Sequence, residues 1–243
     1  MTQFNESQWA LPEFSREYRD NADIFIVERK RLFEIMKSFY RYFIYSREQK
    51  SILDLGCGDG IITHNLLEID ASISATLVDP SSDMMSKARE RFSGYNNINF
   101  VQASFQDLLK SDIIPRDFDF IVSSMAIHHL DMDNKKRLFN FIFIHLKKGG
   151  YFMNIDTVLP PADNLEHWYF RMWNEWVDNK KNALGLERDI FSDLTRRYKD
   201  AAENKPDTLE DQLNALRDIG FKGLDCFYKY GIFSVFGGKK ETS

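Results

Sequence analysis

Residues 54–60 read DLGCGDG and lie between a short apolar run and a stretch with helical spacing. Gly56 and Gly58 allow the backbone to turn sharply and to come close to a bound molecule, because a Cβ at either position would occupy the ligand's space or strain the turn. The helix that begins near Ile61 offers free N–H groups to a carboxylate. This order of strand, turn and helix predicts a loop that cradles a ligand.

Asp79 ends the next apolar run and follows Gly60 by 19 residues. At this spacing an acidic side chain accepts hydrogen bonds from both ribose hydroxyls of an adenosine. A dinucleotide site prefers a third glycine in the pattern G-x-G-x-x-G, whereas this chain has G-x-G-x-G followed by Ile61. The pattern favours a single nucleoside-like cofactor over NAD.

His128 and His129 follow the apolar run that starts at Phe118. An imidazole titrates near neutral pH, so either ring is a candidate base for a proton from an acceptor hydroxyl or amine. The alternative is that the pair packs in the core and makes loop hydrogen bonds. A dedicated base is optional in many transfer reactions, because positioning the reacting groups supplies much of the acceleration.

The segment from Asp54 to Gly60 resembles the first motif of the class I (Rossmann-like) S-adenosylmethionine-dependent methyltransferases, and the later strands follow in that family's order. The resemblance covers about residues 51–156, with a weaker match at 221–239. It implies S-adenosylmethionine as cofactor and S-adenosylhomocysteine as product. It places Asp54 and the loop residues Gly56, Cys57, Gly58 and Gly60 at the amino-acid moiety, and Asp79 with Pro80 at the ribose.

The same resemblance assigns roles to later residues. Met84 matches the side chain that packs on adenine, although an ordinary core methionine is the alternative. Ser104 stands where relatives often carry an acid against the adenine amino group, so that recognition is expected from Ser104 and the Phe105 backbone. Ser124 and Met125 are expected to flank the sulfonium.

The elements that must position these residues follow from hydrophobic spacing. Apolar residues recur at helical spacing from Phe25 to Ile44, so residues 1–50 are expected to form an N-terminal helical cap. Tyr18 lies where similar enzymes fold such a segment over the cofactor, with a helix surface position as the alternative. Residues 159–220 are expected to be a helical insertion whose aromatic cluster, Trp168 to Trp176, lines an acceptor pocket or packs on the domain.

The remaining residues read as alternating strands and helices. We expect one structural domain with an open, mostly parallel, doubly wound seven-stranded α/β sheet and a C-terminal antiparallel strand. Its cofactor-binding core spans residues 51–158 and its last strands 221–243. The expected strands are Ser51–Leu55, Ser74–Val78, Ile98–Gln102, Phe118–Ser123, Gly150–Ile155, Gly223–Tyr230 and Ile232–Gly237.

Composition narrows the function classes. The 243 residues carry a formal net charge of −5, which provides no overall positive field for nucleic acid or an anionic membrane. The sequence lacks a signal peptide and an apolar stretch that spans a bilayer, so a cytoplasmic location is expected. Cys57 and Cys226 lie far apart without metal-ligand spacing, so no metal site or disulfide is expected. Monomer and homodimer both stay open.

These observations predict a methyltransferase that acts on a small molecule, partly aromatic or apolar, at oxygen, nitrogen or carbon. One alternative is an enzyme of the same fold that acts on tRNA or converts the cofactor to a carboxylated form. Another is a protein that binds S-adenosylmethionine without turnover, because a binding motif does not prove catalysis.

Overall fold

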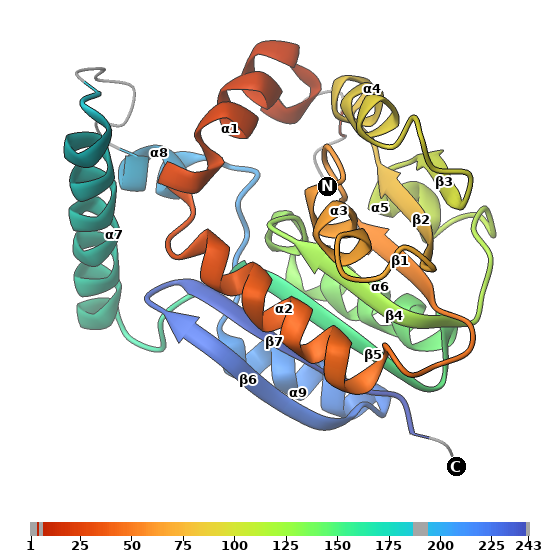
Figure 1. Ribbon diagram of the computed structural model, residues 1–243. Coiled ribbons are helices and arrows are strands. Elements are labelled where there is room, and N and C mark those ends of the chain that lie inside the picture. The colour runs from red at the N-terminus through yellow and green to blue at the C-terminus, as the bar shows by residue number, and fades with distance from the viewer. Residues whose placement is uncertain (1–3, 5–6, 187–193, 242–243) are drawn as a thin grey trace.

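The computed structural model describes residue 4, residues 7–186 and residues 194–241. Its centre is a seven-stranded sheet with the order β3-β2-β1-β4-β5-β7-β6 (Figure 1). Strand β7 is antiparallel to both of its neighbours, and the other paired strands are parallel, which confirms the predicted fold class. The strands are β1 (Ser51–Leu55), β2 (Ser74–Asp79), β3 (Ile98–Gln102), β4 (Phe118–Ser124), β5 (Leu146–Thr157), β6 (Lys222–Tyr230) and β7 (Phe233–Lys239).

Helices cover both faces of the sheet because its strands are apolar on both sides. Ile52 belongs to the core under α2 (Arg29–Phe43), α3 (Ile61–Leu67) and α4 (Ser82–Arg91). Its neighbour Leu53 faces the opposite core, which packs under α5 (Phe105–Leu108), α6 (Met132–His145) and α9 (Leu209–Ile219). The two cores make a three-layer α/β domain.

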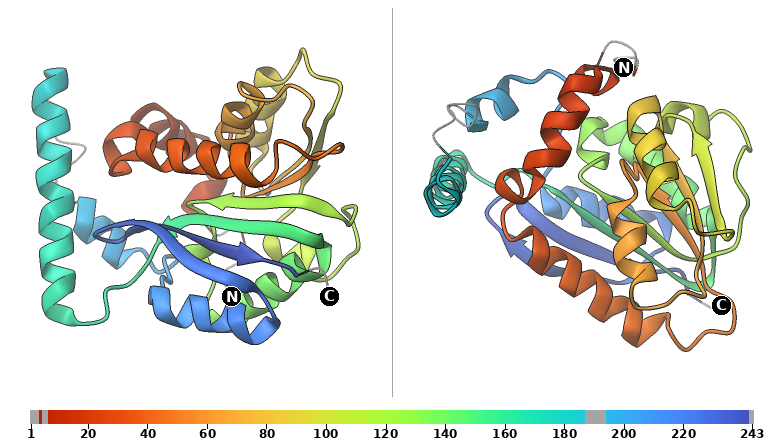
Figure 2. Two further views of the ribbon diagram at one scale, coloured as in Figure 1. Left: turned by 60° about the horizontal axis from the view of Figure 1, so that its bottom comes forward. Right: turned by 45° about the horizontal axis from the view of Figure 1, so that its top comes forward.

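Four further elements gather beyond the sheet: η2 (Gln8–Ala10), α1 (Pro12–Phe25), α7 (Asp163–Leu184) and α8 (Leu194–Asp200). Helix α7 stands at one side of the molecule in Figures 1 and 2. Trp173 of α7 donates a 2.7 Å hydrogen bond from Nε1 to the Phe25 carbonyl, which ties α7 to α1. Residues 187–193 of the predicted insertion lie outside the described residues.

The bounds of five predicted strands differ from the structure: β2 and β4 end one residue later, β6 begins one residue earlier, and β5 and β7 differ at both ends. Strand β5 extends from Leu146 to Thr157 rather than from Gly150 to Ile155, because it pairs with β4 on one side and with β7 up to Thr157 on the other. Strand β7 begins at Phe233, one residue later than expected. The extension of β5 matters because it brings Asp156 into the strand.

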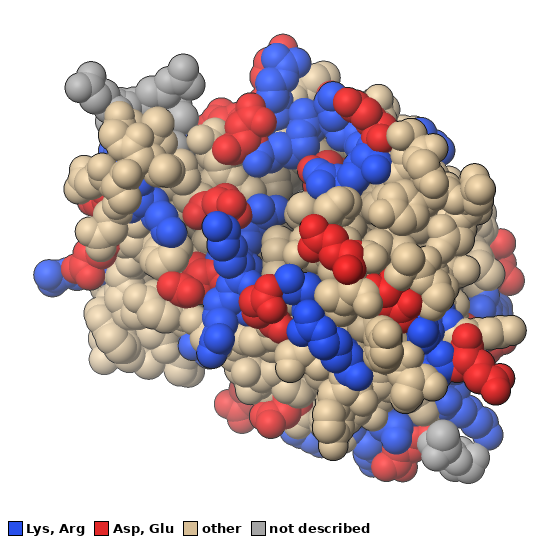
Figure 3. Space-filling model, viewed as in Figure 1, with Lys and Arg blue, Asp and Glu red and all other residues tan. Residues whose placement is uncertain are grey.

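The surface carries charges of both signs. In the face shown in Figure 3, lysine and arginine side chains are interspersed with aspartate and glutamate. Within the described residues, no helix is long and apolar enough to cross a membrane.

Candidate active site

The glycine loop lies between the end of β1 and the start of α3, and its conformation requires glycine. Gly56 and Gly58 have φ angles of +67° and +54°, in the left-handed region that side chains disfavour. A Cβ on Gly56 would also collide with the Ala126 side chain. Gly56 and Cys57 donate their backbone N–H groups to the Val78 carbonyl at 2.8 and 3.0 Å, which holds the loop against the end of β2.

Asp79, the last residue of β2, organises this loop. Its carboxylate accepts backbone N–H bonds from Gly58 at 2.9 Å and from Ser81 at 2.8 Å. Burial raises the pKa of Asp79 to about 6, although these two hydrogen bonds act in the opposite direction. A carboxylate offers about four lone-pair sites, so Asp79 keeps acceptor capacity for a ligand.

A cavity, here called the glycine-loop cavity, opens in front of the loop. Its wall contains the predicted residues Tyr18, Gly56, Cys57, Gly58, Asp79, Pro80, Met84, Ser104, Phe105, Ser124, Met125 and His129. Segments that are far apart in the sequence meet there because the carboxyl ends of parallel strands share one edge of the sheet.

Asp54 and Gly60, which were also predicted to touch the cofactor, lie behind the cavity wall. Asp54 is fully buried and accepts a 2.8 Å hydrogen bond from the Thr63 hydroxyl, and burial raises its pKa to about 7. Gly60 precedes α3 with a φ of +78°, and a Cβ there would meet the ring of Phe92. Both residues shape the loop from behind.

Ser104 and Met84, the residues predicted to contact adenine, both line the cavity but differ in what their side chains contact. The Ser104 hydroxyl caps α5, since it donates to Asp107 Oδ2 at 2.6 Å and accepts from the Asp107 N–H at 3.2 Å. Met84 is buried but lines the cavity, where its sulfur lies 3.6 Å from an Arg19 nitrogen. Arg19 also pairs with Asp83, so α1 is tied to α4 across the cavity.

A second cavity, here called the aromatic cavity, adjoins the first. Its wall is built largely from rings: Trp9, Phe14, Tyr18, Phe25, Trp173, Tyr198 and Phe233, together with His128 and Thr157. Trp9, Tyr18, Ile26, Met125 and His129 line both cavities. These five residues form a boundary that the two cavities share.

Met125 occupies that boundary in an unfavourable backbone conformation. Its φ is +53°, a region that a bulky residue rarely adopts. A 2.8 Å bond from its N–H to the Ile155 carbonyl holds it there. Such outliers persist where the surrounding structure determines them, often at functional sites.

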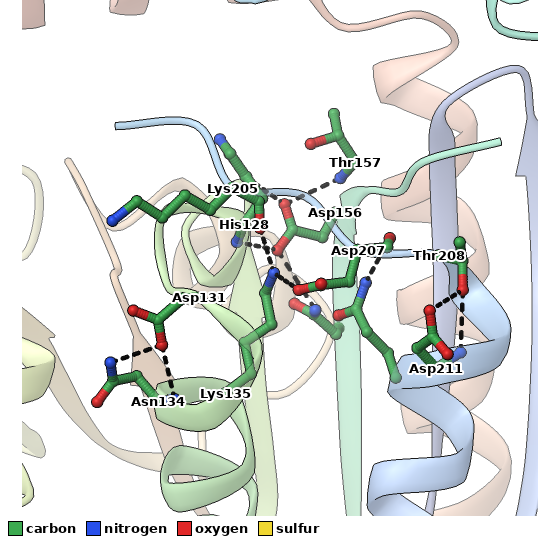
Figure 4. Close-up of polar contacts among 12 residues, drawn as sticks. His128, Asp131, Asn134, Lys135, Asp156, Thr157, Lys205, Asp207, Thr208 and Asp211 are labelled. Carbon is green, nitrogen blue, oxygen red and sulfur yellow. Dashed lines mark hydrogen bonds and ion pairs between the residues drawn. The ribbon is translucent and has the colours of Figure 1, made fainter. Parts of the chain in front are cut away.

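The two histidines have different environments. His128 Nδ1 lies 2.5 Å from Asp156 Oδ1, and the His128 N–H donates to Asp156 Oδ2 at 2.9 Å (Figure 4). Burial would raise the pKa of Asp156, but His128, the Thr157 N–H and Lys135 lower it below its usual value. Asp156 is therefore ionised, and its Oδ1 accepts a hydrogen bond from Nδ1–H of His128, so Nε2 is the ring nitrogen that Asp156 does not contact.

His129 has a strongly lowered pKa. Burial, reinforced by the charge of His128, lowers the pKa of His129 to about 3. Its Nδ1 lies 3.3 Å from the Glu203 carbonyl, and its ring meets the Trp9 ring edge to face at 5.7 Å. At neutral pH His129 is an uncharged and very weak base.

Two tyrosine hydroxyls are among the polar groups of the aromatic cavity, whose wall also contains Gln8, Glu17, Arg197 and Asn204. Burial raises the pKa of Tyr18 to about 12, so its phenol is neutral and can donate a hydrogen bond at physiological pH. The Tyr198 hydroxyl lies 2.7 Å from Thr157 Oγ1. Both side chains face the same cavity as His128.

Sequence analysis missed several of these residues. Asp156 has a signal that could have identified it, because it is an acid at the carboxyl end of a buried strand. Trp9, Tyr198 and Glu203 have no such signal, since only the fold brings residues so distant in sequence together. Among the described residues, no group of three or more His, Cys, Asp or Glu side chains is arranged to hold a metal ion.

Comparisons with known proteins agree with this geometry. The family profile described as a methyltransferase domain matches residues 52–150. The chain is 28% identical to phosphoethanolamine N-methyltransferase of Plasmodium falciparum over 199 residues, which cover 81% of this chain and 70% of that protein. It is 21% identical to carboxy-S-adenosyl-L-methionine synthase of Nautilia profundicola over 90% of this chain and 84% of that protein.

Solved structures show the same fold. An O-methyltransferase family protein from Burkholderia thailandensis superposes with a TM-score of 0.66 at 13% identity, over 98% of this chain. The matched region spans only 63% of that protein's length.

Proposed function

We propose that this chain is a class I S-adenosylmethionine-dependent methyltransferase that transfers a methyl group to a small molecule bound in the aromatic cavity. One observation carries the proposal. His128, which is paired with Asp156, lies in the wall of an aromatic cavity that shares a boundary with the glycine-loop cavity. A methyl donor in one cavity and an acceptor in the other would meet at that boundary.

The residues present fit S-adenosylmethionine. Gly56, Cys57 and Gly58 line the glycine-loop cavity, where their backbone would lie against the ligand's amino-acid portion. Asp79 would accept the ribose hydroxyls, and Met84 would pack on the adenine. The electrophilic methyl of the sulfonium is the chemistry that the cofactor supplies when it is bound.

The chain's own residues would orient the acceptor and take up its proton. When S-adenosylmethionine is bound, its sulfonium would supply the methyl group to the acceptor's oxygen or nitrogen, with S-adenosylhomocysteine as the leaving product. The acceptor proton would pass to Nε2 of His128, and Asp156, which lies 2.5 Å from Nδ1, would stabilise the imidazolium so formed. His129, with its pKa near 3, is too weak a base for this step at neutral pH.

The cavity lining favours an acceptor that is flat and partly apolar. Rings of Trp173, Tyr198 and Phe233 offer faces and edges to an aromatic or apolar body, and Tyr18 offers a hydroxyl donor. A phenol, alcohol or amine presents the proton that His128 is placed to remove. O- or N-methylation is therefore favoured over C-methylation.

The test begins with mass spectrometry of the protein as purified, followed by titration with S-adenosylmethionine. A panel of aromatic and aliphatic hydroxyl and amine compounds is then screened for release of S-adenosylhomocysteine. Release that needs both an acceptor and an intact His128 supports the proposal. Cofactor binding without turnover on any acceptor class would indicate a binding protein instead.

Similarity to carboxy-S-adenosyl-L-methionine synthase favours a second candidate, a chain that makes or uses a carboxylated cofactor. The same mass spectrum separates the two. A bound nucleoside that is 44 Da heavier than S-adenosylmethionine, with both compared as singly charged cations, would carry a carboxylate on the methyl carbon. Its detection would replace our proposal with this second candidate.

Cofactor affinity should depend on pH through Asp79. The ionised carboxylate binds the ribose, so a proton competes with the ligand, and affinity is lost as the pH falls through the raised pKa of about 6. We expect the Kd of S-adenosylhomocysteine to be nearly constant above about pH 7 and to rise by up to about tenfold per pH unit below about 6. Calorimetric titration across this range measures it.

Two variants test whether Asp79 is the group responsible for this pH dependence of cofactor affinity. Asp79→Asn should weaken binding at pH 7.5 by about 1.5–3 kcal/mol and remove the loss on the acid side. Asp54→Asn is the control, because Asp54 has a pKa of about 7 but lies behind the wall, so the loss near pH 6 should remain. An identical pH profile in wild type and Asp79→Asn would contradict the placement of the ribose.

A further inference from the structure

The segment 201–208, between α8 and α9, lines both cavities and contacts the site on several sides. Lys205 donates its backbone N–H to the His128 carbonyl at 2.8 Å, and the Glu203 carbonyl lies 3.3 Å from His129 Nδ1. The Glu203 carboxylate accepts a 2.7 Å hydrogen bond from the Ser7 hydroxyl. The segment therefore joins the N-terminal region to the two histidines.

Lys135 of α6 anchors this segment from beneath. Its side chain is fully buried, and its ammonium donates to the Lys205 carbonyl and pairs with Asp207 Oδ2 (Figure 4). The Asp207 carbonyl in turn accepts the Leu159 N–H at 2.9 Å, just beyond β5. One buried cation thus connects α6, the segment and the exit of the strand that carries Asp156.

We propose that Lys135 is a positioning residue: its buried ammonium holds the segment 201–208 against His128 and so fixes both the His128–Asp156 pair and the shared wall of the two cavities. The inference concerns the site of the proposed function, but it rests on contacts that exist whether or not the chain transfers a methyl group.

Physical chemistry gives Lys135 this role rather than a purely stabilising one. A buried ion pair contributes little net stability compared with apolar residues of the same volume, and its best attested use is to select one arrangement. The Lys135 charge also acts on the site directly, since it helps to keep Asp156 ionised and His129 neutral. Loss of the Lys135 charge would release the Lys205 carbonyl. The N–H of the same residue, Lys205, donates to the His128 carbonyl, so this contact would be disturbed as well.

The experiment compares Lys135→Met with Lys147→Met in the full chain. Lys147 also forms an ion pair, with Asp119 at 2.7 Å, but at the start of β5 and outside the walls of both cavities. Three properties are measured: the thermal midpoint, the Kd of S-adenosylhomocysteine by calorimetry, and the far-downfield proton resonance of His128 Nδ1–H. The last is assigned by its absence in His128→Asn.

We expect Lys135→Met to shift or broaden the His128 resonance and to raise the Kd by about tenfold, whereas Lys147→Met should leave both as in wild type. The double variant Lys135→Met/Asp207→Leu serves in case the single variant fails to fold. It should recover stability, because no unpaired charge stays buried, and still show the altered resonance.

A variant that is less stable but has an unchanged His128 resonance and unchanged ligand affinity would overturn the proposal and leave Lys135 a structural residue. None of these readouts needs a methyl acceptor. Failure of the proposed function would appear as absent turnover in wild type, and failure of this inference as an unmoved resonance.

Discussion

Replacing His128 by asparagine is expected to lower kcat for methyl transfer by about 10²- to 10⁴-fold, the usual contribution of a general base. Asparagine has no lone pair of comparable basicity to receive the acceptor proton, although its amide can still donate to Asp156 across the 2.5 Å contact that His128 makes. The Kd of S-adenosylhomocysteine should change by less than about threefold, because His128 does not line the glycine-loop cavity. Steady-state kinetics and calorimetry provide the two numbers.

His129→Asn is the matched control for this prediction. The two histidines are neighbours in sequence, and their ring centroids lie 4.0 Å apart. His129 is held neutral with a pKa near 3, so its loss should change KM more than kcat. An equal fall in kcat for both variants, or no fall for His128→Asn, would refute the assignment of the base.

Gly56→Ala is expected to raise the Kd of S-adenosylhomocysteine by at least about 100-fold. A non-glycine residue in the left-handed region costs about 1–2 kcal/mol, which is roughly a 5- to 30-fold effect. The added Cβ also collides with Ala126, on the loop that carries Met125, so the backbone must move at the cavity wall. Calorimetry on the purified variant measures the change.

Gly185→Ala separates backbone strain from the collision. Gly185 has a φ of +63°, close to the +67° of Gly56, but a Cβ there meets nothing within 4 Å. This control should lose some thermal stability and keep wild-type affinity. Wild-type affinity in Gly56→Ala itself would show that the glycine loop does not hold the ligand.

The order of the elements could be predicted because local signals agree with each other. Strands such as Ser51–Leu55 (SILDL) and Ile98–Gln102 (INFVQ) are short segments rich in Ile, Leu, Phe and Val, and both occur at the predicted positions. Strand β5 was harder, because Lys147, Lys148, Gly149 and Gly150 resemble a turn. Pairing with β4 and β7 overrides that local signal.

The candidate site was partly predictable for a related reason. The positions of Gly56, Gly58 and Asp79 follow from one βαβ unit, whose spacing is fixed by chain geometry. Asp54 shows the limit of that reasoning, because a residue in a strand faces one side or the other, and here the side chain turns inward to Thr63. Ser104 likewise lies at the cavity, but its hydroxyl caps a helix.

By itself, the sequence determined the fold class, the glycine loop and the type of cofactor, since each depends on residues that are close in the chain and on the periodicity of apolar positions. Only the tertiary structure decided which histidine has a carboxylate partner, that two cavities share a boundary, and that Lys135 lies beneath them. Those relations join residues such as His128 and Asp156, or Lys135 and Asp207, through packing across the strand ends. No local pattern encodes such distances, because they are set by the whole core.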